Sequence, residues 1–83
     1  MQVTLKLFAS LGSFLPAGAS RNKAALDIDG DTSILALLDS HNVPREKCHL
    51  VLVNGVFHPP EDRDKVILNE GDVVAVWPPV AGG

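Results

Sequence analysis

Two consecutive glycines, Gly82 and Gly83, close the sequence a short distance after Pro78 and Pro79. Glycine has no Cβ, so a Gly-Gly end can enter a channel too narrow for a side chain and leaves its carboxylate unhindered. The two prolines fix φ and favour an extended chain that stands away from the folded body. We therefore predict a flexible, extended tail over residues 78–83 that presents the Gly83 carboxylate for chemistry.

A free carboxylate is a poor electrophile and must be activated before it can react, for example as an acyl-adenylate made with ATP. The sequence lacks the Gly-Lys-Ser/Thr ending of a phosphate-binding loop. Its 83 residues make one small domain that cannot enclose a substrate cavity of its own. We expect a carrier and not an enzyme, with no bound cofactor and with ATP used by a partner protein.

Composition limits the other partners. Seven Lys and Arg stand against ten Asp and Glu, giving a net charge of -3, which argues against nucleic acid as a partner. No apolar run approaches the roughly 18 residues that span a bilayer, and the start does not resemble a signal peptide. The single cysteine cannot form an internal disulfide. We expect a cytoplasmic protein without a membrane partner.

Cysteine and histidine residues suggest other chemistry, which their spacing disfavours. Cys48 and His49 resemble a nucleophile and its base, but neighbouring strand residues point to opposite faces of a sheet. His41, His49 and His58 do not have the ligand spacing of a zinc site with Cys48. We expect a structural thiol and no metal site.

Three aspartates imitate the start of a calcium-binding loop. Asp27, Asp29 and Asp31 alternate as in such a loop, but Thr32 stands where glycine is needed and Leu38 where the bidentate glutamate is needed. We therefore assign these aspartates to turns and to helix capping.

The first third of the chain predicts two strands joined by a long loop. Residues 2–8 alternate between apolar and polar positions, with Val3, Leu5 and Leu7 on one face. Turn-forming residues fill positions 9–23, where Leu11, Phe14 and Leu15 can anchor the loop on the core. A second strand over residues 24–29, with Leu26 and Ile28 inward, would pair back on the first.

A short amphipathic helix follows. Asp31 or Thr32 is the expected N-cap, and Asn42 and Pro44 are expected to end the helix. The apolar stripe of this helix consists of Ile34, Leu35, Leu37 and Leu38.

The second half of the chain predicts a hairpin and a final strand. Residues 49–53 form an apolar strand, Asn54-Gly55 is a strong hairpin turn signal, and Val56-Phe57 begin the return strand. The charged run over residues 61–65 alternates in sign and predicts a solvated loop, and residues 66–68 a short extended piece. A turn at Glu70-Gly71-Asp72 leads into the last strand, residues 73–77.

The last strand is apolar on both faces, which is typical of a strand in the middle of a sheet. Its expected neighbour is the first strand. We predict an α+β fold: a mixed sheet of four to five strands with one main helix packed across it, the β-grasp arrangement of ubiquitin-like proteins. Residues 1–77 would form this domain, and residues 78–83 the tail.

The final third of the chain resembles the MoaD/ThiS family of sulfur carrier proteins, and within it most closely the MoaD branch, the small subunit of molybdopterin synthase. The resemblance rests on Val53-Asn54-Gly55, on the segment Leu68 to Val76, and on Trp77-Pro78-Pro79 followed by Gly82-Gly83. Residues 3–9 also resemble the opening strand of the family. The loop over residues 11–23 and the Pro59-Pro60 pair depart from it.

The resemblance implies a mechanism. An E1-like enzyme of the MoeB/ThiF type would adenylate the Gly83 carboxylate, and sulfur from a cysteine desulfurase or rhodanese-type sulfurtransferase would replace AMP to give a thiocarboxylate. The tail would then enter a MoaE-like large subunit and deliver sulfur for molybdenum or tungsten cofactor synthesis. Gly82 would supply flexibility, Val80 and Ala81 would line the channel, and Pro78 and Pro79 would set the exit direction.

Aromatic residues are enriched at interface cores, so Trp77, Phe8 and Phe57 are candidates for a docking surface, with packing in the core as their alternative. Two other functions remain open. The chain is alternatively a ThiS-like carrier for thiazole, tRNA or cysteine synthesis, or a ubiquitin-like modifier that joins Gly83 to a lysine through an isopeptide bond.

Overall fold

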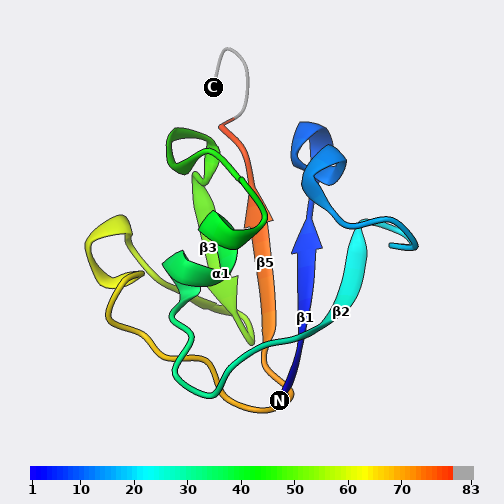
Figure 1. Ribbon diagram of the computed structural model, residues 1–83. Coiled ribbons are helices and arrows are strands. Elements are labelled where there is room, and N and C mark those ends of the chain that lie inside the picture. Colours follow the sequence, from blue (N-terminus) through cyan, green and yellow to red (C-terminus); the bar gives the residue numbers. More distant parts are fainter. Residues whose placement is uncertain (80–83) are drawn as a thin grey trace.

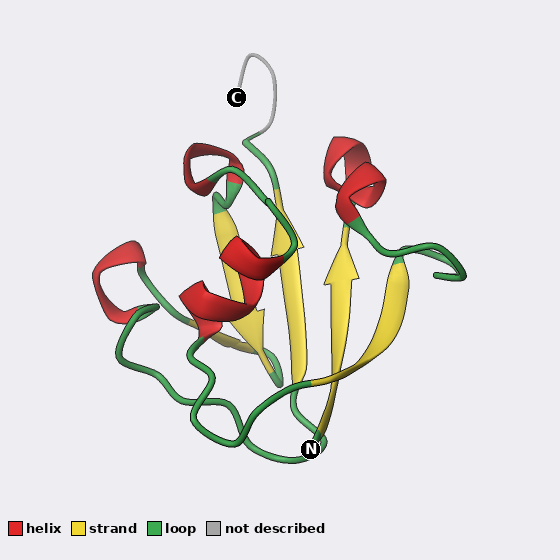
Figure 2. Ribbon diagram, viewed as in Figure 1, coloured by secondary structure: helices red, strands yellow, loops and turns green. Residues whose placement is uncertain are grey.

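The computed structural model describes residues 1–79, which contain five strands, one α-helix and three 3₁₀ helices. Figures 1 and 2 show the helix lying across one face of the sheet. The strands are β1 (Gln2–Leu7), β2 (Lys23–Asp27), β3 (Leu50–Val53), β4 (Val56–Phe57) and β5 (Val73–Trp77); the helices are α1 (Ile34–Ser40), η1 (Ala9–Phe14), η2 (Arg45–Lys47) and η3 (Pro60–Asp62).

The strands form one mixed sheet in the order β2-β1-β5-β3-β4. β1 and β5 run parallel at its centre, while β2 pairs antiparallel with β1, and β3 pairs antiparallel with both β4 and β5 (Figure 1). This confirms the predicted α+β, β-grasp architecture, including the central position of the first and last strands.

The core lies between the sheet and α1. Alternation along the central strands places every second residue on this inner face. Val3, Leu5 and Leu7 of β1 are at most 2% exposed, as predicted. They belong to one buried cluster with Val74 and Val76 of β5, Val51 and Val53 of β3, Ile34, Leu37 and Leu38 of α1, and Leu11 of η1.

Two tight turns set the register of the hairpins. Asn54 and Gly55 both have positive φ, 51° and 84°, as the predicted hairpin turn requires. Arg21 and Asn22 form a second such turn, with φ of 53° and 65°, and Ser20 and Lys23 exchange backbone hydrogen bonds of 3.0 and 3.1 Å across it. The long predicted loop therefore consists of η1, a connecting stretch and a tight hairpin turn into β2.

The N-cap of α1 differs from the predicted one. Ser33, and not Asp31 or Thr32, caps the helix, because its Oγ accepts a hydrogen bond of 3.0 Å from the Ala36 amide. Thr32 instead donates its hydroxyl to the Asp29 carbonyl, 2.8 Å away, within the preceding turn. Asn42, with φ of 61°, adopts the left-handed conformation expected just after the helix.

The charged segment over residues 61–65 is the second difference. It was predicted as a solvated loop, but the Arg63 side chain is buried, with only 4% of the residue exposed. Its neighbours Asp64 and Lys65 are exposed, so the prediction fails at one position in the run.

Candidate functional site

The root of the tail, defined here as Trp77–Pro79, begins at the last residue of the central strand β5. Two backbone hydrogen bonds hold the end of β5 from both sides: the Phe8 amide donates to the Val76 carbonyl, and the His49 amide donates to the Trp77 carbonyl, both at 3.1 Å. In Figure 1, η1 and η2 flank this end of the strand. The exit point of the chain is therefore fixed by both neighbouring segments.

An aromatic stack stands beside the tail root. The rings of Phe8 and Trp77 lie 4.4 Å apart between centroids and are 5° from parallel. Both residues follow an inner-face residue, Leu7 or Val76, so alternation turns them to the face of the sheet opposite α1. Both are half-buried and lie outside the buried cluster.

A single row of residues crosses this face from edge to edge. The strand registers align Lys23 with Lys6, Lys6 with Ala75, Ala75 with Leu52, and Leu52 with Phe57. Phe8, Trp77 and Leu50 lie on the same face, each two residues away in sequence from a member of this row, at the end where the tail root begins. We call these eight residues the outer face.

The outer face is divided into an apolar part and a cationic part. Phe57 is 50% exposed and Leu50 is 36% exposed, while Lys6 and Lys23 occupy the other side of the row. The three aromatic residues chosen from the sequence thus share one face. Phe8 and Trp77 stack, whereas β3 separates Phe57 from Trp77.

Four of the predicted site residues, Val80, Ala81, Gly82 and Gly83, lie outside the described residues. Pro78 and Pro79 are described, and neither belongs to a helix or strand.

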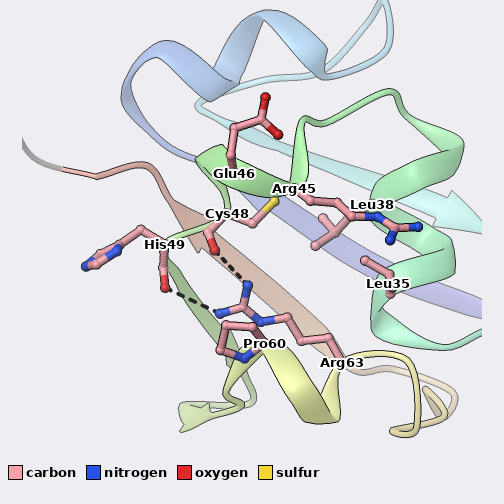
Figure 3. Close-up of a pocket in the computed structure, with 8 residues that line it drawn as sticks. All are labelled: Leu35, Leu38, Arg45, Glu46, Cys48, His49, Pro60 and Arg63. Carbon is pink, nitrogen blue, oxygen red and sulfur yellow. Dashed lines mark hydrogen bonds between the residues drawn. The ribbon is translucent and has the colours of Figure 1, made fainter.

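Arg63 anchors the loop after β4 to the start of β3, on the side of the sheet that carries α1. Its Nε donates to the His58 carbonyl at 3.0 Å. Its Nη1 and Nη2 donate to the carbonyls of Cys48 and His49 at 2.6 and 3.3 Å (Figure 3). Burial lowers the pKa of the guanidinium from its ordinary value, opposed by the charge of Glu61. Sequence reasoning missed this residue because its neighbours are solvated.

A pocket of about 370 Å³ lies beside this anchor, between α1, η2 and η3. Leu35, Leu38 and Pro60 supply apolar walls, and Cys48 and Arg63 also line it (Figure 3). It is separate from the outer face, because its lining residues come from the helix side of the fold.

Cys48 and His49 point apart, as predicted (Figure 3). The predicted reason, alternation along a strand, does not apply, because β3 begins at Leu50 and Cys48 is the C-cap of η2. The Cys48 thiol is buried and donates to the Pro44 carbonyl at 3.4 Å, while His49 is exposed. Burial is the main cause that raises the pKa of the Cys48 thiol, so little thiolate forms near neutral pH. The pair is therefore not arranged as a nucleophile and base.

Within residues 1–79, no three His, Cys, Asp or Glu side chains gather as a metal site would require. In the same part of the chain, no helix has the length and apolar character needed to cross a membrane.

A family model described as the ThiS family matches residues 6–83. Among solved structures, SAMP1 from Haloferax volcanii is 27% identical with a TM-score of 0.67, and the match covers 100% of both chains. ThiS, a thiamine biosynthesis protein from Geobacter metallireducens, is 19% identical with a TM-score of 0.62, covering 96% of this chain and 99% of that chain. No curated protein sequence matches the chain.

A complex of subunits 1 and 2 of the molybdopterin-converting factor from Helicobacter pylori also matches, at 19% identity and a TM-score of 0.60, covering 100% of this chain and of the matched chain. The two neighbours at 19% identity support the fold alone. The family model extends over nearly the whole sequence, including the Gly-Gly end. The chain therefore belongs to the ThiS family, whose members are small ubiquitin-like sulfur carriers or modifiers.

Proposed function

We propose that this protein carries sulfur on its tail for the synthesis of the molybdenum or tungsten cofactor. The Gly83 carboxylate attacks ATP on an E1-like enzyme, forming an acyl-adenylate and releasing pyrophosphate. The terminal persulfide sulfur of a cysteine desulfurase or sulfurtransferase then displaces AMP, which gives an acyl disulfide. A second thiol cleaves this disulfide, forming a new disulfide with the donor cysteine and releasing the thiocarboxylate on Gly83. The thiocarboxylate then donates its sulfur inside a large subunit of the MoaE type.

The observation that carries the sulfur-carrier part of this proposal is the family match, which continues through the tail to residue 83. The molybdenum or tungsten cofactor as destination rests on the resemblance of the final third of the chain to the MoaD branch. The fold supports it, because the chain leaves a fully paired central strand and enters Pro78-Pro79 directly. Proline rings restrict φ and cannot donate a backbone hydrogen bond, so they disfavour further pairing with the sheet. The final glycines carry no side chain that would obstruct an enzyme channel.

The outer face is the proposed docking surface for the partner enzymes. The eight residues of the outer face lie near the end of the sheet where the tail begins. Among them, Phe57 and Leu50 leave apolar surface exposed. A partner that covers these side chains gains free energy from their burial and approaches the tail at the same time. One solved neighbour of the same fold is a complex of two molybdopterin-converting factor subunits, and we propose a large-subunit partner of that kind for this chain.

Intact-mass measurement tests the sulfur-carrier proposal. After incubation with ATP, the activating enzyme and a sulfur donor, the protein should gain the mass difference between sulfur and oxygen. Deletion of Gly83 or replacement of Gly82 by a bulky residue should abolish the gain without unfolding the domain.

Gly30→Ala is the matched control, because a Cβ built there has no atom within 4 Å and its φ is ordinary. This variant should be converted like the wild type. An unconverted wild-type protein, with an enzyme shown to be active on another carrier, would contradict the proposal. Conversion followed by failure to form molybdopterin with the large subunit would instead favour a ThiS-like acceptor pathway.

A second candidate function, protein modification, is favoured by the match to small archaeal modifier protein 1 (SAMP1) from Haloferax volcanii. Two structures of that protein match, at 27% and 26% identity. A modifier would join Gly83 to a partner lysine by an isopeptide bond. Protease-digested proteins from the native cell would then contain lysines carrying a tail-derived glycine remnant, and the deletion of Gly83 should remove them.

A further inference from the structure

The cationic part of the outer face has no counterion within the described chain. Lys6 and Lys23 are direct cross-strand partners, and like charges in this arrangement are unfavourable. Across residues 1–79, the single ion pair joins Arg45 to Asp39, at 2.7 Å, and involves neither lysine. Contacts among residues 1–79 therefore provide no ion pair for either lysine.

The positive charge of this part of the outer face is opposite in sign to the net charge of the whole chain, which is -3. None of the eight outer-face residues is acidic. The strand carboxylate on the same side, Asp27, pairs with Gln2 at the other end of β2, roughly 13 Å along the strand from Lys23. Acidic residues are thus absent from the outer face itself, while Glu46 of η2, which flanks the same end of β5, lines the pocket on the helix side of the fold.

Lys23 is exposed and Lys6 is half-buried, and the exposed Arg21 adds a third cation next to this surface. It occupies a turn position with φ of 53°, where glycine, asparagine or aspartate is favoured. Arg21 precedes Lys23 by two residues, at the same corner of the sheet.

The cationic and apolar parts are close enough for one partner to cover both. The row from Lys23 to Phe57 crosses five strands, a width of roughly 19 Å at the usual spacing between strands. A standard protein interface of about 800 Å² per partner is roughly 28 Å across if it is square, which exceeds this width. A partner centred on Ala75 and Leu52 therefore also reaches the lysines.

We propose that the enzyme that activates the tail binds the outer face with an apolar centre flanked by carboxylate side chains, which face Lys6 and Lys23. This inference rests on the proposed function, because it requires an activating enzyme that approaches the tail root. The apolar part, with Phe57 and Leu50 exposed, favours a protein over a nucleic acid or a lipid headgroup as the anionic partner. Charges at the rim of an interface act mainly on the association rate and on its salt dependence.

Lys6→Glu is the informative variant, because it reverses one charge and creates an opposite-charge pair with Lys23. The melting temperature should be equal to or above that of the wild type, since the repulsive cross-strand pair is replaced by an attractive one. Activation should nevertheless weaken. A defect that appears without loss of stability separates docking from folding.

The measurement is ATP-pyrophosphate exchange by the E1-like enzyme encoded in the same genome, with the carrier concentration varied. At low ionic strength, Lys6→Glu should raise KM by about tenfold and leave kcat unchanged, because the tail itself is intact. The difference from the wild type should shrink near 0.5 M salt, where screening is strong. Lys6→Arg, which keeps the charge, should restore the wild-type KM.

Lys65→Glu is the matched control, because it makes the same change in net charge at an exposed position in the loop after η3. Equal KM values for Lys6→Glu and Lys65→Glu at low salt would overturn the inference while leaving the proposed function intact. Absence of exchange with the wild-type carrier would instead overturn the proposed function, and this inference with it.

Discussion

The two faces of the sheet are built from alternating residues of the same strands, yet their surroundings are opposite. On the inner face, Leu5 of β1, Val76 of β5 and Val51 of β3 are fully buried under α1 and its neighbours. On the outer face of the same strands, Leu50 is 36% exposed, and Lys6, Leu52 and Trp77 are half-buried. Exposed side chains also stand at the margins of this face, Phe57 on β4 and Lys23 on β2.

This difference separates residues that maintain the fold from residues available to a partner. Burial within the chain already stabilises the inner face, so changes there should alter stability first. The outer face contributes less to folding and is adjacent to the tail root, so changes there should alter docking first.

The largest expected effect is a difference in stability between two leucine variants, one on the inner side of the sheet and one on the outer face. Leu37→Ala removes a side chain that is 1% exposed and should lower the free energy of unfolding by about 2–5 kcal/mol. Leu50→Ala, at a position that is 36% exposed, should cost about 1 kcal/mol or less. Urea denaturation of both variants measures the contrast. Equal losses would mean that the outer face is packed as tightly as the core.

A smaller effect is expected from two arginines. Arg63→Gln leaves carbonyl groups of His58, Cys48 and His49 without their donor and should cost roughly 1–3 kcal/mol. Arg45→Gln breaks only an exposed ion pair with Asp39 and should leave the melting temperature nearly unchanged. Thermal unfolding compares them. An unchanged melting temperature for Arg63→Gln would show that the three carbonyl groups find other hydrogen-bond donors.

The smallest effect on stability, combined with a clear effect on docking, is expected at Phe57. Phe57→Ala and Ile67→Ala both truncate exposed apolar side chains, 50% and 46% exposed, and each should change stability by about 1 kcal/mol or less. Only Phe57→Ala should reduce kcat/KM for activation, by about tenfold, because Phe57 belongs to the outer face. Similar kinetics for the two variants would remove Phe57 from the docking surface.

Much of the fold followed from local patterns in the sequence. Alternation identified β1 with Val3, Leu5 and Leu7 inward, the Asn54-Gly55 pair located the β3-β4 hairpin, and the apolar run over residues 73–77 indicated a central strand. These features depend only on residues close together in the sequence. The alternation of apolar and polar residues and the residue types favoured in tight turns therefore suffice to predict them. The helix N-cap was misplaced by one or two residues, because Asp31, Thr32 and Ser33 are all suitable capping residues.

The sequence by itself determined the alternating strands, the hairpin turn and the Gly-Gly ending, together with the proline pair before it. Only the tertiary structure decided that Arg63 is buried, since its acceptors lie 14 and 15 residues away in sequence. It likewise decided that Lys23, Lys6, Ala75, Leu52 and Phe57 form one row. Register between strands depends on the packing of the complete core, so no local pattern can align residues from five separate strands.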